Sequence, residues 1–219
     1  MLATGHRPSD FTRNSRPSAL VMRRGQGFDT QPAPWLRERR MEAPAPLRKS
    51  LALVICDIAG TTGLGAQEGD LVVATVLREF FEQAGRLSTE HHCLIIKFLG
   101  DSFLAAFENV ANVMPFVLSV QSLLSQNPIF IGRSLGFKFS LHYGDALCIE
   151  TSYGKDILGK NVNIAARLND LAGPHEIVVS QVALERMPID CRVGAGSSET
   201  RSVKGVGDVE FCRIPLPGA

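Results

Sequence analysis

The sequence predicts an α+β domain built on a ferredoxin-like βαββαβ core, with extra strands and helices added at its C-terminal end. Two observations lead to this prediction. Between residues 51 and 150, apolar runs typical of strands alternate with stretches of helical periodicity in the order β, α, β, β, α, β. That order is typical of an antiparallel sheet whose helices pack on one face, which leaves the other face or an edge open to a partner.

The first half of this core brings two acidic residues to the ends of strands. The near-continuous apolar run "LALVICDIAG" indicates a buried strand that starts at residue 51 and ends at Asp57 and a glycine turn. Apolar residues at helical spacing predict an amphipathic helix over 67–86. Two apolar runs around Gly100 and Asp101 in "CLIIKFLGDSFLAAF" then predict a tight hairpin with the acid at its tip.

The second half of the core repeats this pattern. A helix is expected over 110–126, where Pro115 is tolerated only in the first turn. The segment "GFKFSLHYGDALCIE" predicts another pair of strands. The last third predicts a short helix over 161–172, a strand at "EIVVS" and a terminal pair of strands around 191–214.

The first 50 residues differ in composition from the rest of the 219-residue chain. They hold ten Lys or Arg against four Asp or Glu, with several prolines and no sustained periodicity. Such a segment buries too little apolar surface to fold alone, so we expect a flexible basic arm over 1–50, a globular domain over 51–214 and a tail over 215–219. An Arg-rich start is also typical of a transit peptide or of a tether to a membrane surface.

The composition excludes several classes of protein. A formal net charge of +1 lacks the basic excess of a dedicated nucleic-acid-binding domain, so no nucleic-acid partner is expected. No apolar run approaches the roughly 20 residues needed to cross a bilayer, so no membrane span is expected. The five cysteines are widely spaced and form no CxxC pair, which suggests neither a disulfide framework nor a zinc site and favours the reducing cytoplasm.

Asp57 and Asp101 would be neighbours in this fold. Two converging carboxylates suit one or two Mg²⁺ ions, which prefer hard oxygen ligands and leave positions for phosphates. The loop "DIAGTTG", which contains Thr62, adds glycines and backbone N–H groups that suit a phosphate chain. Taken singly, either acid is explained as well by a turn that it caps.

The helix "KNVNIAARLNDLA" places Asn163 and Arg167 four residues apart, on one face. A guanidinium fork beside an amide would stabilise developing phosphoryl charge, although a simple surface contact is the alternative. His142 lies in a predicted strand beside an apolar residue, where a histidine is more often structural, so we leave it out of the site.

Five ordered motifs resemble the catalytic domain of the class III nucleotidyl cyclases. They are "ICDIAGTTGL", "IIKFLGDSFLAAF", "SLHYG", "KDILGKNVNIAARL" and "VKGVGD", and the resemblance extends over 51–214. Five motifs in order are far more specific than any one of them. The resemblance implies a head-to-tail homodimer in which the metal-binding residues of one protomer face the other site residues of its partner.

The resemblance also implies roles for the chemical residues. Asp57, the Ile58 carbonyl and Asp101 would hold two Mg²⁺ or Mn²⁺ ions. Asn163 would orient the ribose, and Arg167 would stabilise charge on the α-phosphate in the transition state.

Further positions match the family's substrate contacts. Lys204 matches a lysine directed at the terminal phosphates, and Lys97 with Asp156 would select the base. Two positions depart from the family pattern, because Thr61 stands where Phe is usual and Lys138 where Arg is usual. Lys138 keeps the charge of a triphosphate contact but loses the bidentate fork.

The base-selecting pair favours ATP. Lys97 only donates and ionised Asp156 only accepts, which complements adenine's N1 acceptor and N6 donor. Guanine presents the opposite order, so GTP should be a poor substrate, whereas cytosine repeats adenine's pattern and CTP is not excluded. We therefore predict an adenylate cyclase, in which the ribose 3′-oxygen attacks the α-phosphorus in line and pyrophosphate leaves.

Three alternatives remain at this point. A pyrimidine or guanine nucleotide cyclase is the first, and the pyrimidine enzyme is the closest enzymatic competitor. A diguanylate-cyclase-like enzyme would explain "LGDSF" but not "NVNIAARL" or Lys204. A catalytically silent cyclase-like module that binds nucleotide and dimerises is the third, and the presence of the acids, the base-reading pair and the amide–guanidinium pair argues against it.

Overall fold

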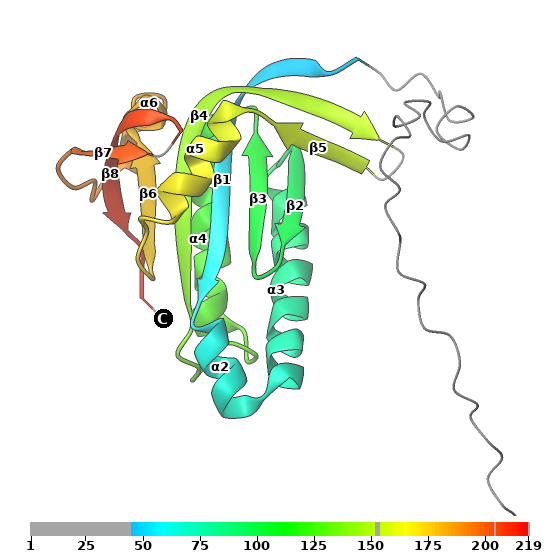
Figure 1. Ribbon diagram of the computed structural model, residues 1–219. Coiled ribbons are helices and arrows are strands. Elements are labelled where there is room, and N and C mark those ends of the chain that lie inside the picture. Colours follow the sequence, from blue (N-terminus) through cyan, green and yellow to red (C-terminus); the bar gives the residue numbers. More distant parts are fainter. Residues whose placement is uncertain (1–44, 152–153, 204, 219) are drawn as a thin grey trace, which may run out of the picture. The chain divides into compact units, whose positions relative to one another are not determined.

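The computed structural model describes residues 45–151, 154–203 and 205–218, which form one sheet with helices on both faces (Figure 1). The strands are β1 (Leu47–Ala59), β2 (Ile95–Leu99), β3 (Ser102–Phe107), β4 (Gly136–Thr151), β5 (Gly154–Leu158), β6 (Glu176–Ser180), β7 (Glu199–Val203) and β8 (Gly207–Pro215). The helices are α2 (Thr61–Glu68), α3 (Asp70–Glu90), α4 (Val113–Gln126), α5 (Lys160–Asn169) and α6 (Gln181–Leu184), with 3₁₀ turns η1 (Val110–Asn112) and η2 (Ile189–Arg192). Most of the expected basic arm lies outside the described residues.

The order of the strands is that of a ferredoxin-like core with additions. The path through the sheet is β2-β3-β1-β4-β6-β8-β7, and β5 pairs with β4. The first four strands along this path are antiparallel to one another, as predicted. β6 then runs parallel to β4, and β8 and β7 follow as an antiparallel pair. The predicted α+β class and ferredoxin-like core are confirmed, and the sheet as a whole is mixed rather than purely antiparallel.

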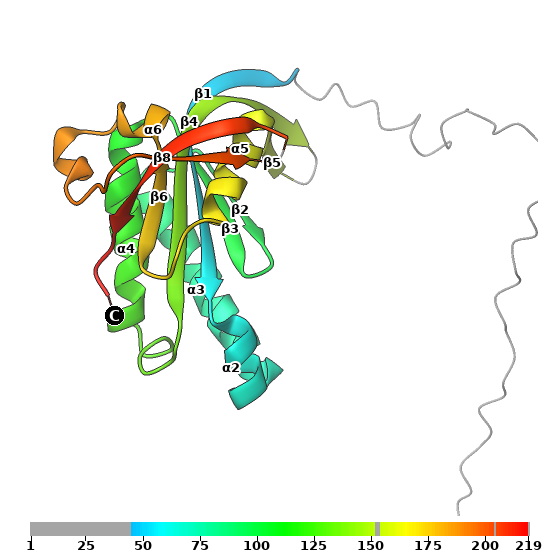
Figure 2. The same cartoon turned by 60° about the vertical axis from the view of Figure 1, so that its left-hand side comes forward.

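Helices cover both faces of the sheet (Figures 1 and 2). Alternate side chains of β1 point to opposite faces. One set packs with α3 and α4: Ala52, Val54, Cys56 and Ile58. On the other face, Leu51 and Leu53 pack with Ala165 of α5. From residue 51 to residue 56, β1 is therefore apolar at every position because it is buried on both sides. The expectation of helices on one face holds for α3 and α4 but not for α5.

Two elements differ from their predicted form. The helix expected over 67–86 is α3, and a separate helix, α2, precedes it; the two are joined at Gly69, whose φ of 88° favours glycine. α2 buries only Leu64, so it carries no apolar periodicity that a sequence pattern could reveal. The segment predicted as a strand pair is the single strand β4, because continuous pairing with β1 keeps the chain extended through Gly144.

The hairpin and the second long helix form as expected. Leu99 pairs with Ser102 across a turn made by Gly100 and Asp101. Pro115 is the third residue of α4 and so lies in its first turn, where the missing N–H breaks no helical hydrogen bond. No helix among the described residues combines the length and the apolar character needed to cross a membrane.

Candidate active site

The end of β1 and the tip of the β2–β3 hairpin bring the predicted metal ligands together. Asp57 pairs with Ser102 in the β1–β3 register, so Asp101 is the next residue along the hairpin. The backbone N–H of Ile58 donates to the Asp101 carbonyl at 3.2 Å. The end of β1, which carries Asp57 and Ile58, and the turn that carries Asp101 therefore lie at one end of the sheet. Figure 1 shows α2 starting directly after this end of β1.

The Asp57 carboxylate forms an ion pair with Lys138, its direct cross-strand neighbour on β4. The two side chains are 24% and 23% exposed. At this partial exposure the carboxylate is neutralised by the ammonium, and water still reaches both groups. Lys138, which we expected to contact the triphosphate, thus lies at the acidic end of the site.

Helix α2 forms one wall of an open pocket beside Asp101. The Thr61 hydroxyl donates to the Asp101 carboxylate at 3.0 Å, so the residue that departs from the family pattern holds a predicted metal ligand. The pocket measures about 620 Å³ and is lined by Thr61, Thr62, Gly65, Ala66, Asp70, Val73, Leu77, Gly100 and Asp101. Gly60 is required at the turn, since a Cβ there would lie 2.3 Å from the Ser134 carbonyl oxygen.

The donors at this end fit a hard divalent cation. Mg²⁺ is commonly bound by one or two carboxylates, with water and substrate phosphate completing its shell. The described residues contain no group of three or more His, Cys, Asp or Glu side chains that could hold a metal. A metal at Asp57 and Asp101 would therefore take its other ligands from backbone carbonyls such as that of Ile58, from water and from the nucleotide.

Lys97 on β2 and Asp156 on β5 are joined by a hydrogen-bonded ion pair of 2.7 Å. The other carboxylate oxygen of Asp156 accepts from the backbone N–H of Ile157 at 2.8 Å. The hydrogen bond from Lys97 is the main reason that the pKa of Asp156 lies below its ordinary value. The side chains remain 40% and 27% exposed, so a donor and an acceptor stand side by side and open to a ligand.

Replacing Lys97 by Met should raise the pKa of Asp156 toward the ordinary range, because it removes the hydrogen bond that favours the ionised form. The carboxyl carbon of Asp156, titrated by NMR, measures this directly. Because the folded-state pKa is depressed, the pair's contribution to stability is present above the unfolded-state pKa and is lost as the pH falls through the lowered one. Lys155→Met is the matched control, and an equal shift in that variant would contradict the assignment.

Asn163 and Arg167 lie on the exposed side of α5, as the spacing predicts. The buried residues of this helix are Ile164, Ala165, Leu168 and Asn169. The Arg167 side chain is 55% exposed and contacts Asp170 at 3.2 Å. Across the described segments, no hydrogen bond or ion pair links either residue to Asp57 or Asp101. Lys204, the remaining predicted contact, lies outside the described residues.

Asn169 is a residue of the site's framework that the sequence analysis missed. Its side-chain amide, 6% exposed, donates to the carbonyls of Ile55 at 3.1 Å and Lys138 at 3.2 Å. It therefore attaches the end of α5 to β1 and β4 next to the Asp57–Lys138 ion pair. The available signal was an amide on the buried face of an amphipathic helix, since a buried polar group needs a partner.

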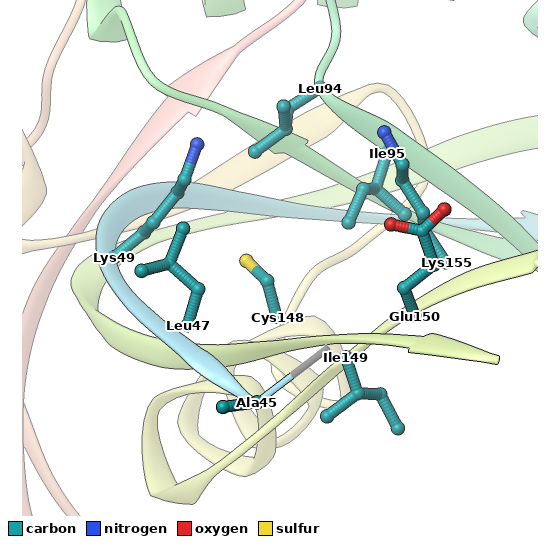
Figure 3. A pocket seen from close by; sticks show the side chains of 9 residues that line it. All are labelled: Ala45, Leu47, Lys49, Leu94, Ile95, Cys148, Ile149, Glu150 and Lys155. Carbon is teal, nitrogen blue, oxygen red and sulfur yellow. The ribbon is translucent and has the colours of Figure 1, made fainter. Parts of the chain in front are cut away.

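A second pocket, of about 330 Å³, lies at the opposite end of β1 (Figure 3). Its lining combines apolar side chains and Cys148 with charged groups at its rim: Ala45, Leu47, Lys49, Leu94, Ile95, Cys148, Ile149, Glu150 and Lys155. None of the predicted site residues that the structure describes lines it. Ile149, which pairs with Asp156 in the β4–β5 register, and Lys155, the residue before Asp156, do line it, so the pocket borders the Lys97–Asp156 pair and lies away from the acidic end of the site.

Comparison with known proteins identifies the family. The family model described as the adenylate and guanylate cyclase catalytic domain matches residues 44–212. An adenylate cyclase of Glutamicibacter nicotianae is 24% identical over 165 residues, which cover 75% of this chain. The chain spans only 39% of the length of that relative.

Solved structures share the fold. The catalytic core of a rhodopsin-guanylyl cyclase with converted specificity, in complex with ATPαS, superposes with a TM-score of 0.66 at 15% identity, over 78% of this chain and 98% of that one. For the adenylyl cyclase CyaB from P. aeruginosa the TM-score is 0.63 at 16% identity, over 80% and 98%. Adenylate cyclases from Trypanosoma brucei in their monomeric state give 0.66 at 17%, over 77% and 89%. Because the family model covers residues 44–212 and the fold is that of solved cyclase domains, this chain belongs to the class III nucleotidyl cyclases, the family of adenylate and guanylate cyclase catalytic domains.

Proposed function

We propose that this protein is an adenylate cyclase that converts ATP to 3′,5′-cyclic AMP and pyrophosphate. The observation that carries the proposal is the contact between Lys97 and Asp156. It places one donor and one acceptor together, matching adenine's N1 and N6 and leaving guanine's N1–H and O6 facing groups of the wrong kind. The name of the Glutamicibacter nicotianae relative agrees with this choice.

Each of the remaining residues has its own role in the in-line attack of the ribose 3′-oxygen on the α-phosphorus. Asn163 orients the ribose, and the Arg167 guanidinium stabilises the charge that develops on the α-phosphate. Mg²⁺ or Mn²⁺, when bound by Asp57, Asp101 and the Ile58 carbonyl, would lower the pKa of the 3′-hydroxyl and neutralise phosphate charge. Lys138, Thr62 and Lys204 supply the contacts to the triphosphate.

We further propose that the site is completed by a second copy of the chain in a head-to-tail homodimer. Asn163 and Arg167 occupy the exposed side of α5, and among the residues that the structure describes Arg167 contacts only the surface acid Asp170. In a two-fold dimer the same surface serves twice, so each dimer would hold two equivalent sites. The metal-binding acids of one protomer then face the α5 residues of the other.

The nucleotide itself tests the proposal. We expect the purified chain, given ATP, GTP, CTP or UTP separately with Mg²⁺ or Mn²⁺, to form cyclic AMP from ATP and little product from GTP, with products identified by mass spectrometry. Cyclic CMP or cyclic GMP as the main product would overturn the base assignment while keeping the enzyme class. A folded dimer without product from any nucleotide would favour the silent nucleotide-binding module.

A further inference from the structure

The first turn of α5, which carries Asn163, is weakly held by its own backbone. The N-terminal cap of the helix is Gly159, with φ of 141°, and no side chain caps the turn. The hydrogen bond from the Asn163 N–H to the Gly159 carbonyl is long, at 3.4 Å. The initial N–H groups of any helix lack partners within the helix, and an uncapped first turn frays. Something other than the helix must therefore fix the position of Asn163.

Asn161 supplies that restraint from within the same turn. Its amide nitrogen donates to the Asp145 carbonyl of β4 at 2.8 Å, and its amide oxygen lies 3.0 Å from Nε2 of His142, also on β4. The amide packs directly on Gly144, where a Cβ would lie 2.5 Å from the Asn161 side chain. Gly144 thus leaves the space in which this contact forms.

His142 connects Asn161 to the interior of the domain. It is 6% exposed, and its Nδ1 lies 2.8 Å from the hydroxyl of Ser180 at the end of β6. Ser180 is itself fixed, because its oxygen accepts from the Ala183 N–H and so caps α6. The first turn of α5 is therefore connected through one imidazole to two strands of the sheet.

The hydrogen bonds of Asn161 determine which ring nitrogen of His142 carries the proton. The Asn161 amide nitrogen donates to a carbonyl, so its oxygen must accept, and Nε2 of His142 must carry the proton. Nδ1 is then the acceptor for the Ser180 hydroxyl. Burial lowers the pKa of His142, which favours the neutral ring that this arrangement requires.

We propose that His142 is a positioning residue for the cyclase reaction, which acts through Asn161 to fix the N-terminal turn of α5 and thereby Asn163. This inference rests on the proposed function. The ribose 3′-oxygen must reach the α-phosphorus in line, and a misplacement of about 1 Å costs roughly 100-fold in rate. His142 contributes by removing the freedom of an otherwise uncapped turn, without contact with the nucleotide.

Variants of the three contacting residues test the proposal. We expect His142→Leu, Asn161→Ala and Gly144→Ala each to lower kcat roughly 10–100-fold while KM for ATP changes less than about threefold, because orientation for attack is lost and binding of base and phosphates is kept. His142→Gln retains an N–H near the Nε2 position and should recover much of kcat. His142→Leu combined with Asn161→Ala should be no slower than the slower single variant, because both break one contact.

His91→Leu is the matched control. His91 also contacts a serine hydroxyl, that of Ser119, at 3.0 Å, but it lies at the end of α3. Its loss should leave kcat within about twofold. Melting temperature and dimer content, measured for every variant, identify any protein that is simply unfolded.

Two readouts do not depend on catalysis. ¹⁵N NMR of the His142 ring should show a protonated Nε2 and an unprotonated Nδ1, and amide exchange at Asn163 should accelerate in Asn161→Ala but not in His91→Leu. Full kcat in folded His142→Leu, additive effects in the double variant or the opposite tautomer would overturn the inference. If the unchanged protein cyclises no nucleotide, the proposed function fails instead, and the NMR and exchange results still decide whether His142 fixes the turn.

Discussion

Asp57→Asn and Asp101→Asn proteins are expected to lose more than about 1,000-fold in cyclase turnover, which corresponds to roughly 4 kcal/mol of transition-state stabilisation. Both acids lie at the same end of the sheet, at the end of β1 and the tip of the hairpin. An amide has nearly the size of the carboxylate but no charge, so it binds a divalent cation far less well. The loss should appear in kcat with either Mg²⁺ or Mn²⁺.

The fold should survive both changes. The Asp57 side chain is 24% exposed, and its partner Lys138 is 23% exposed, so water can solvate the ammonium when the carboxylate is gone. Asp70→Asn is the matched control, because Asp70 lines the same open pocket as Asp101 but is not a proposed ligand. It should retain turnover within about threefold. Full activity in either Asp57→Asn or Asp101→Asn, or an equal loss in Asp70→Asn, would contradict the metal assignment.

The parts of the fold that the sequence predicted well are those with strong local signals. β1 reads as an almost unbroken apolar run, and the β2–β3 hairpin is marked by Gly100 and Asp101 between two such runs. Pro115 correctly constrained the start of α4. In each case neighbours in sequence determine the conformation, so a short window contains the information.

The predictions that were wrong depended on tertiary contacts. The Tyr143–Gly144–Asp145 segment resembles a turn, yet pairing with β1 keeps it extended within β4. Nothing in the pattern of α5 indicates which face of the sheet it covers; that is determined by the match of Ala165 to Leu51 and Leu53.

The residues of the candidate site likewise fall into those that a short motif could identify and those whose contacts depend on the tertiary structure. Residue types and motif order could nominate Asp57, Asp101 and the α5 pair, because each lies within a short motif. The resemblance also nominated Lys97 and Asp156 as a pair, but it did not predict their direct hydrogen bond. That bond joins positions 59 residues apart and depends on β5 pairing with β4 so that it comes close to β2. Thr61 was noted only as a departure from the family pattern, and that departure did not predict the hydrogen bond from its hydroxyl to the Asp101 carboxylate. Contacts of this kind follow from register and backbone path, which composition and periodicity do not specify.

Mixing two inactive variants should restore activity if the proposed dimer shares its sites. Asp57→Asn lacks a proposed metal ligand, and Arg167→Ala lacks the guanidinium proposed to stabilise the α-phosphate. In a heterodimer, one site combines the intact Asp57 of the second variant with the intact Arg167 of the first, while the other site carries both defects. With equal amounts and random exchange, half the dimers are mixed and half their sites are intact, so about a quarter of the unaltered activity should return.

A second mixture, of the two variants that each lack one acid, is the control for this mixing experiment. Asp57→Asn mixed with Asp101→Asn should remain inactive, because in the proposed dimer each site would take both acids from one protomer and every heterodimer would still have two defective sites. Arg167 is 55% exposed and, within the described part of the chain, pairs only with the surface acid Asp170, so its removal should leave folding and subunit exchange intact. Heterodimer formation is measured by native mass spectrometry of differently tagged chains, and activity by cyclic AMP release. Demonstrated heterodimers without recovery would exclude a shared site, whereas recovery in the acid–acid mixture would mean that the two acids come from different protomers.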